Sequence, residues 1–285
     1  RVGAIRVSDE PANPVVSVKL TGVEVDAILE KALAEDRPGN RRQKLRELLF
    51  LSLGITATPE EMFVKHELVW RGTRRSVLVD FQNVREVADE VLRVKGDEWK
   101  LILDFPFDEA GRTPADDHAR LEQFRQKGES SQVFCWIPRF FSRDAQADLG
   151  RLVILDHLLK GDRLRQHTPD LSDVDRAAAR GEMENLQSQL RSRLMNDLEL
   201  AYGLRTEPGS RRIDGTHEIE QVLVSLDASF SPRPPVAADL KEGLRKVVEQ
   251  LLGHLYPGHP VFEEELKPAL VRKVAEEVRR AAEAV

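Results

Sequence analysis

Two clusters of basic side chains carry the strongest chemical signal in the sequence. The first is RPGNRRQKLR, residues 37–46, with five basic residues and no acidic one, and the second is RGTRR, residues 71–75. Lys and Arg that neutralise nucleic-acid phosphates release counterions, so binding of this kind weakens steeply with salt. Ordinary solvated helix starts and turns carry the same residues, and both interpretations stay open. The candidate DNA-contacting residues are Arg41, Arg42, Lys44, Arg46, Arg71, Arg74 and Arg75.

Acidic residues at the end of an apolar run form a second candidate site. The run LILDFPFDE, residues 101–109, carries Asp104 and Asp108, which with Asp80 would form the metal site of a metal-dependent nuclease. In the usual magnesium-binding strand end the acids are adjacent and a phosphate-binding loop lies upstream. Neither holds here, so we favour a buried strand followed by a solvated acidic turn, and we assign no metal site.

Other catalytic patterns are missing from the sequence. No G-x-x-x-x-G-K-[ST] phosphate-binding loop, G-x-S-x-G nucleophile elbow or H-E-x-x-H zinc motif occurs. The single cysteine, Cys135, lies in an apolar segment and fits a small core residue. A Ser–His–Asp triad assembles in three dimensions, so spacing leaves it open. We assign no catalytic residue and expect no cofactor in this chain.

The composition describes a globular chain from a reducing compartment. The 285 residues are 41% hydrophobic and 32% charged, with a formal net charge of −6. No apolar stretch approaches the roughly 18 residues that a membrane span needs, and a single cysteine fits the cytoplasm. The chain opens at Arg1 in a polar stretch, which we interpret as part of a longer protein.

The order of elements in the first part is typical of a winged helix. A strand at 15–20 and a helix from Thr21 to about residue 35 precede a second helix at 41–53. Alternating residues then predict a β-hairpin over 62–81. In a winged helix the second helix enters the DNA groove. The basic residues would therefore begin the recognition helix and form the tip of the wing.

A small α/β unit is predicted next. After a short helix near 84–92, the apolar runs 99–107 and 132–137 predict buried strands. Between these two strands, Thr113 and Pro114, with acids in the following turn, predict the start of a helix. If the two strands are parallel, this helix would form a right-handed crossover connection between them.

The last part is predicted to be helical. Ser142 starts one helix, two closing helices lie near 238–255 and 265–284, and the longest helix covers 172–202. The apolar residues of the longest helix form a narrow stripe among charges, which is typical of a coiled-coil-like arm or a partner face. The predicted partner surface consists of Met183, Leu186, Leu190, Leu194 and Leu198.

The predicted fold class is α+β and mostly helical. Because 285 residues rarely form a single core, we expect several folded parts. They are a linker at 1–14, a winged-helix-like part with the basic hairpin at 15–96, a small α/β unit at 97–160, and a C-terminal helical part with one long helix at 161–285.

Several phrases of the sequence resemble one known family. They are GVEVDAILEKALAEDRPGNRRQKLRELLF (22–50), DEWKLILDFPFDEAGRTPADDHARL (97–121), VFCWIPRFFSRDAQADLGRLVILDHLL (133–159), and SPRPPVAADL with YPGHPVFEEELKP (within 231–268). Together they cover about half of the chain. They resemble the PglY/BrxC-type ATPases of bacteriophage-exclusion (BREX) and phage-growth-limitation systems.

The resemblance implies a large bacterial phage-defence ATPase whose phosphate-binding loop, with ATP and Mg, lies outside this chain. It implies partners among the other BREX or Pgl components, including a methyltransferase, and a cytoplasmic location without membrane contact. The function that we expect is a non-catalytic regulatory or scaffold region that couples nucleotide state elsewhere in the protein to DNA or partner binding. The alternatives are an autonomous winged-helix DNA-binding module and, more remotely, the metal-dependent nuclease.

Overall fold

The chain divides into two compact units, one built from residues 1–48 and 143–196 and the other from 49–142 and 197–285. The predicted α+β class is confirmed, whereas the predicted domain boundaries stay a prediction. Thr21 and most of the predicted linker at 1–14 lie outside the residues that the structure describes. The computed structural model describes residues 4–7 and 16–19 by their backbone, and residues 24–58, 61, 63–94, 99–207, 209–214 and 222–283.

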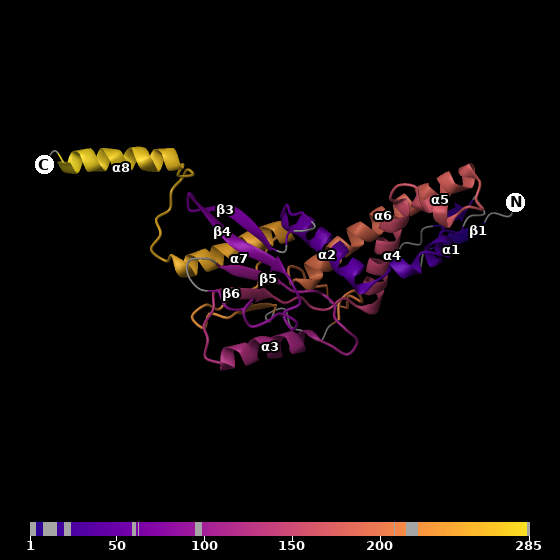
Figure 1. Cartoon of the computed structure of the whole chain (residues 1–285), viewed down its shortest axis with the longest axis horizontal. Coiled ribbons are helices and arrows are strands. Elements are labelled where there is room, and N and C mark those ends of the chain that lie inside the picture. Colours follow the sequence, from indigo (N-terminus) through magenta and orange to yellow (C-terminus); the bar gives the residue numbers. More distant parts are fainter. Residues whose placement is uncertain are drawn as a thin grey trace. The chain divides into compact units, whose positions relative to one another are not determined.

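The first unit is mostly helical (Figure 1). Its two short strands, β1 (Ala4–Val7) and β2 (Val16–Lys19), pair antiparallel. Lys44 and Gln187 each contact Asp156, which joins three helices through polar side chains. The helices are α1 (Val25–Glu30), the 3₁₀ helix η1 (Leu33–Glu35), α2 (Pro38–Leu53), α4 (Arg143–Leu159), α5 (Arg163–His167) and α6 (Asp173–Ala201), of which α2 and α6 continue into the second unit.

The apolar stripe of α6 lies in the interior of the chain. Met183, Leu194 and Leu198 are fully buried, Leu190 is buried nearly as deeply, and Leu186 is half-buried. The long helix itself begins and ends within one residue of the predicted bounds. Other parts of the chain therefore cover this stripe, and its use as a partner surface stays a prediction.

Gly150 of α4 provides room for an ion pair between η1 and α2. Arg41 donates from Nε and Nη2 to the Asp36 carboxylate at 2.5 and 2.7 Å, and this pair raises the pKa of Arg41. A Cβ atom at Gly150 would overlap the Asp36 carboxylate and would lie 2.7 Å from Arg41 Nη2. The missing side chain therefore lets the ion pair pack directly against α4.

We expect Gly150→Ala to lower the free energy of unfolding by about 1–2 kcal/mol. Overpacking costs roughly 1–3 kcal/mol, which exceeds the ~1 kcal/mol that alanine gains over glycine in a helix. In a chain that carries both Asp36→Ala and Arg41→Ala, which removes both side-chain groups that the new Cβ would meet, the same change should instead be stabilising by up to ~1 kcal/mol. Urea unfolding measures both differences, and equal effects in the two backgrounds would contradict this packing.

The second unit is built on a five-stranded mixed sheet in the order β3-β4-β5-β6-β7. β4, β5 and β6 are parallel to one another, and the two outer pairs are antiparallel. The predicted strand–helix–strand unit is therefore parallel, with α3 (Pro114–Gln126) as its crossover. The strands are β3 (Phe63–Trp70), β4 (Thr73–Phe81), β5 (Lys100–Leu103), β6 (Val133–Trp136) and β7 (Leu223–Ser225).

Alternating residues of the sheet pack on two sides. Ile102, Cys135 and Val133 belong to one core cluster with Leu121 and Phe124 of α3, which confirms Cys135 as a core residue. α3 starts as predicted, because the Thr113 amide donates to Asp116 Oδ2 at 2.9 Å. Trp136, from the other set of sheet residues, donates from Nε1 to the Tyr202 carbonyl at 2.9 Å. The sheet is thus covered by α3 on one face.

The predicted hairpin is confirmed, but its turn is shorter than the segment 71–75. Only Arg71 and Gly72 separate the strands, with φ of 46° and 75°. Two consecutive positive φ values are the requirement of a type I′ turn, which glycine meets without steric cost. Arg74 and Arg75 consequently belong to β4, where successive side chains point to opposite faces.

Three expectations differ from the structure. The predicted helix at 84–92 is a series of turns, because the Asn83 side chain accepts the Arg85 amide at 2.9 Å and holds a local turn. The strand predicted over 99–107 ends at Leu103. The winged helix is not confirmed, since β4 continues into the mixed sheet instead of ending as a free wing.

Two closing helices complete the second unit, α7 (Leu240–Leu255) and α8 (Pro268–Glu283), as the sequence predicts. α7 lies along β3 (Figure 1) and starts at Asp239, whose side chain accepts the Glu242 amide at 2.8 Å. α8 buries none of its residues. Within the described part of the chain, every helix is too short or too polar to cross a bilayer.

Candidate functional site

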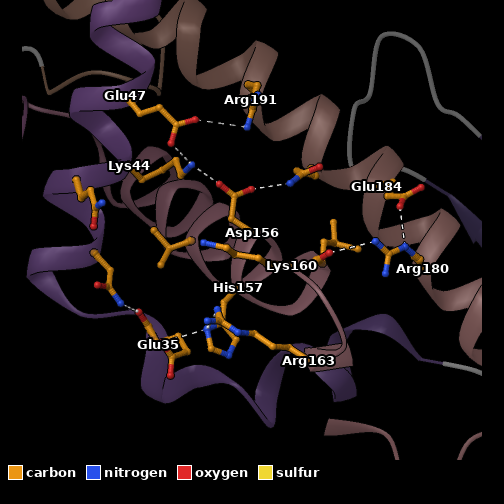
Figure 2. Close-up of a pocket in the computed structure, with 15 residues that line it drawn as sticks. Glu35, Lys44, Glu47, Asp156, His157, Lys160, Arg163, Arg180, Glu184 and Arg191 are labelled. Atoms are coloured by element: carbon orange, nitrogen blue, oxygen red, sulfur yellow. Dashed lines mark hydrogen bonds and ion pairs between the residues drawn. The ribbon is translucent and has the colours of Figure 1, made fainter. Parts of the chain in front are cut away.

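A polar pocket of about 700 Å³ lies in the helical unit, between η1, α2, α4, α5 and α6 (Figure 2). Its volume falls in the range of ligand pockets in proteins. Charged and amide side chains dominate the lining, and no Ser, Thr or Cys occurs among the described residues that form it. The arrangement can bind a polar ligand and supplies no hydroxyl or thiol nucleophile.

Asp156 is the central acid of this pocket. Its carboxylate pairs with the Lys44 ammonium and accepts Gln187 Nε2 at 2.6 Å. Lys44 also pairs with Glu47, which lies 3.8 Å from Arg191 Nη2. These contacts connect α2, α4 and α6 (Figure 2), and they neutralise most of the charge on this side of the pocket.

His157 lies between a cation and an acid. Its Nδ1 is 2.9 Å from Arg163 Nη1 and 3.3 Å from Glu35 Oε2. Burial lowers the pKa of His157, and Arg163 lowers it further, whereas Glu35 raises it. Because a guanidinium can only donate, Nδ1 accepts from Arg163 when the imidazole is neutral.

Two cations of the pocket have no carboxylate partner among the described residues. Lys160 points into the middle of the pocket (Figure 2), and Arg163 bonds the His157 ring instead of an acid. By contrast, Arg180 donates to Glu184 at 3.0 Å and to the Leu159 carbonyl at the end of α4. Positive charge is therefore uncompensated near Lys160 and Arg163.

The basic residues predicted at 41–46 lie on α2 and are only partly accessible. Arg41 is committed to Asp36, and Lys44 to Asp156 and Glu47. Arg42 and Arg46 are half-buried. The helix therefore uses part of its basic side chains for internal ion pairs, and its DNA contact stays a prediction.

The arginines of the hairpin tip contact the segment 256–266, which follows α7. Arg71 Nη1 donates to the His259 carbonyl at 2.9 Å, and the Arg75 guanidinium lies 4.4 Å from the ring centre of Tyr256. Arg74 donates to Glu265 at 2.9 Å and to Glu67 at 3.4 Å. A Cβ at Gly72 would lie 2.5 Å from the Cβ of Phe262. The tip is thus covered, and its three arginines do not share one face.

The acids proposed for a nuclease site have separate partners. Asp80 accepts Gln82 Nε2 at 2.8 Å, and Arg85 donates to both oxygens of Asp108 at 2.8–2.9 Å. In the part of the chain that the structure describes, no three His, Cys, Asp or Glu side chains gather as metal ligands. The structure gives no support to the nuclease hypothesis.

A buried pair of acids lies at the carboxyl ends of the parallel strands. Asp104 follows β5 and Asp117 lies in the first turn of α3, and both are 1% exposed. Burial, followed by the charge of Asp117, raises the pKa of Asp104. Burial, followed by the charge of Asp108, raises the pKa of Asp117 to about 7. Such a pair favours the protonated form of both acids in the folded chain.

The pocket residues were not predicted from the sequence. Asp156, His157, Lys160 and Arg163 lie within the stretch DHLLKGDR. The available signal is that these charged residues follow the apolar run of α4 near its end. That pattern also describes the solvated end of an ordinary helix, so it does not indicate a pocket by itself.

The fold and pocket define a two-unit α+β domain with a polar pocket that is lined mostly by charged and amide side chains. The model of the PglY fourth domain matches residues 28–256, about four fifths of the chain. The chain therefore belongs to the PglY fourth-domain family, and its expected relationship to PglY-type phage-defence proteins is confirmed. No solved structure matches the chain.

Proposed function

We propose that this chain is a non-catalytic regulatory domain of a phage-defence ATPase. It would couple the nucleotide state held elsewhere in that protein, where ATP and Mg bind, to the binding of DNA or of a partner. The partners would be other BREX or Pgl components in the cytoplasm, including a methyltransferase. Family membership supports the defence context.

The observation that carries the regulatory role is the uncompensated charge of Lys160 and Arg163 in the pocket. Lys160 is exposed and Arg163 is half-buried, and neither has a carboxylate within ion-pair distance among the described residues. Cations that line a pocket without a carboxylate partner are available to an anionic ligand. We therefore assign the ligand-responsive part of the proposed function to this pocket.

The proposal is tested in the complete defence protein by replacing both cations, Lys160→Gln with Arg163→Gln. We expect this variant to lose phage protection, measured by plating efficiency, and to hydrolyse ATP at the wild-type basal rate. Arg165→Gln is the matched control, since Arg165 is an exposed cation on α5 that does not line the pocket. Unchanged protection, or ATP hydrolysis that falls together with protection, would contradict a regulatory role.

DNA contact by the hairpin tip is a second candidate function. The pairing of Arg74 with the carboxylate of Glu265 favours it, because this arginine donates to an anionic oxygen where a phosphate oxygen could bind. The acid-rich segment over the tip would then compete with DNA. This alternative needs no ligand in the pocket.

We expect Glu265→Gln to strengthen binding of a DNA duplex a few-fold, since it removes the acidic partner of an exposed arginine. Replacing Arg71, Arg74 and Arg75 by glutamine should abolish binding and its salt dependence. Fluorescence anisotropy at two salt concentrations measures both effects. If the triple replacement leaves the DNA affinity unchanged, the hairpin is not the DNA contact.

A further inference from the structure

From the pocket geometry we infer that this site binds a small molecule carrying a phosphate group, held by Lys160 and Arg163. The inference deepens the proposed function, on which it rests, by naming the chemistry of the ligand. It depends on three features of the pocket, which are the charge of its lining, the bonding of His157 and its size.

The lining holds five cationic and four carboxylate side chains, which give a formal charge of +1 with His157 neutral and +2 with His157 protonated. Lys44, Arg180 and Arg191 each lie within ion-pair distance of a carboxylate. Lys160 and Arg163 do not, as far as the described residues extend. When a proton on His157 offsets Glu35, the charges of Lys160 and Arg163 match one phosphate dianion, which accepts charge-assisted hydrogen bonds from both ammonium and guanidinium.

The bonding of His157 allows the neighbouring acid to be neutralised when an anion binds. In the structure His157 Nδ1 accepts from Arg163 at 2.9 Å. If Arg163 turns to a phosphate oxygen, Nδ1 is free to take a proton and to donate to Glu35, 3.3 Å away. The other titratable groups near this ring are Asp156 of α4 and Lys160, which directly follows α4, and His167, whose ring centre lies 5.8 Å away.

The size of the pocket favours a phosphate ester over the free ion. About 700 Å³ suits a ligand of nucleotide size, and a lone phosphate would leave most of this space to water. The Gln43 and Gln187 side chains also line the pocket, and their amides offer donors and acceptors to the remainder of an ester.

Titration calorimetry on the full 285-residue chain tests the inference with three probes, namely inorganic phosphate, adenosine monophosphate as an ester of suitable size, and adenosine. We expect the ester to bind at least tenfold more tightly than phosphate, and adenosine to show no binding. Adenosine that binds as tightly as its monophosphate would overturn the assignment. So would the absence of heat with both phosphate-bearing probes.

Variants locate the site. Lys160→Gln and Arg163→Gln should each weaken binding of the monophosphate about tenfold or more, whereas Arg165→Gln should leave it unchanged and Lys160→Arg should retain most of it. The imidazole signals of His157 in NMR spectra should shift when the monophosphate is titrated into the chain.

Lys160 is exposed, so the Lys160→Gln variant is expected to fold, and circular dichroism checks this. Unchanged affinity in both glutamine variants would overturn the site.

Failure of this inference is distinguishable from failure of the proposed function. If the chain does not bind phosphate esters but the double variant still removes phage protection, the pocket is regulatory and takes another ligand. If esters bind at Lys160 and Arg163 but the double variant still protects against phage, the ligand assignment is supported and the regulatory role is wrong.

Discussion

Asp117→Asn is expected to make the chain more stable than wild type at pH 8, by about 4 kcal/mol, and to leave its stability unchanged near pH 4. Asp117 has a pKa of about 7 in the folded chain and 3.8 in its unperturbed state. A shift of about three units corresponds to about 4 kcal/mol. Urea unfolding of the two proteins across this pH range measures the difference.

The sign follows from proton binding. Between pH 4 and pH 7 the folded chain holds the Asp117 proton more tightly than the unfolded chain does. The stabilising effect of this proton is therefore complete below pH 4, decreases as the pH rises to 7, and is absent above it. Asparagine resembles the protonated acid and removes this dependence. Equal stability of variant and wild type at pH 8 would contradict the buried state of Asp117.

Asp116 provides the matched control, because it is the neighbouring acid in the same helical turn. The Thr113 amide donates to its carboxylate and lowers the pKa of Asp116. Asp116→Asn should therefore be destabilising at pH 8, with an effect that fades as the pH falls through the lowered pKa. The two substitutions have opposite expected signs, so a general effect of removing charge cannot explain both.

Leu190→Ala is expected to lower the free energy of unfolding by about 2–5 kcal/mol. Leu190 is 2% exposed, and deletion of a buried leucine side chain removes its burial energy and leaves a cavity. Val174→Ala is the control, because Val174 lies on the same helix and is 78% exposed. Its substitution should change stability by no more than about 0.5 kcal/mol. Urea denaturation measures both.

This comparison separates a core stripe from a partner surface. If the α6 stripe served mainly to bind another protein, Leu190→Ala would weaken assembly and leave the stability of the isolated chain nearly unchanged. A loss of stability without any partner present instead places Leu190 in the core of this chain. Near-identical unfolding curves for Leu190→Ala and wild type would contradict the packing described here.

Local patterns predicted much of the fold. Alternating residues identified the hairpin, and Thr113 with Pro114 identified the start of α3, because both features depend on neighbours in sequence. The spacing of apolar residues also predicted the stripe of α6, but a narrow stripe does not indicate which residues cover it. A narrow stripe serves equally for a coiled coil and for a helix whose apolar partners come from distant parts of the same chain.

The pocket depends on distant residues and could not be predicted. Glu35, Lys44, His157 and Arg180 come from four separate elements, whose approach is set by tertiary packing. The hairpin shows the same limit, because Arg74 looked available for phosphate until the structure placed Glu265 beside it. Charge pairing across long sequence separations leaves no periodic signal in either partner.

We propose that this domain couples the nucleotide state of the defence protein to the binding of DNA or of a partner. The most direct test measures how much of the partner components the complete defence protein captures in the presence of ATP and in the presence of ADP. We predict that capture differs several-fold between the nucleotides in wild type and in Arg165→Gln, and that the difference disappears in the Lys160→Gln, Arg163→Gln variant. Capture that is the same in both nucleotides for wild type, or a nucleotide difference that survives in the double variant, would contradict the account.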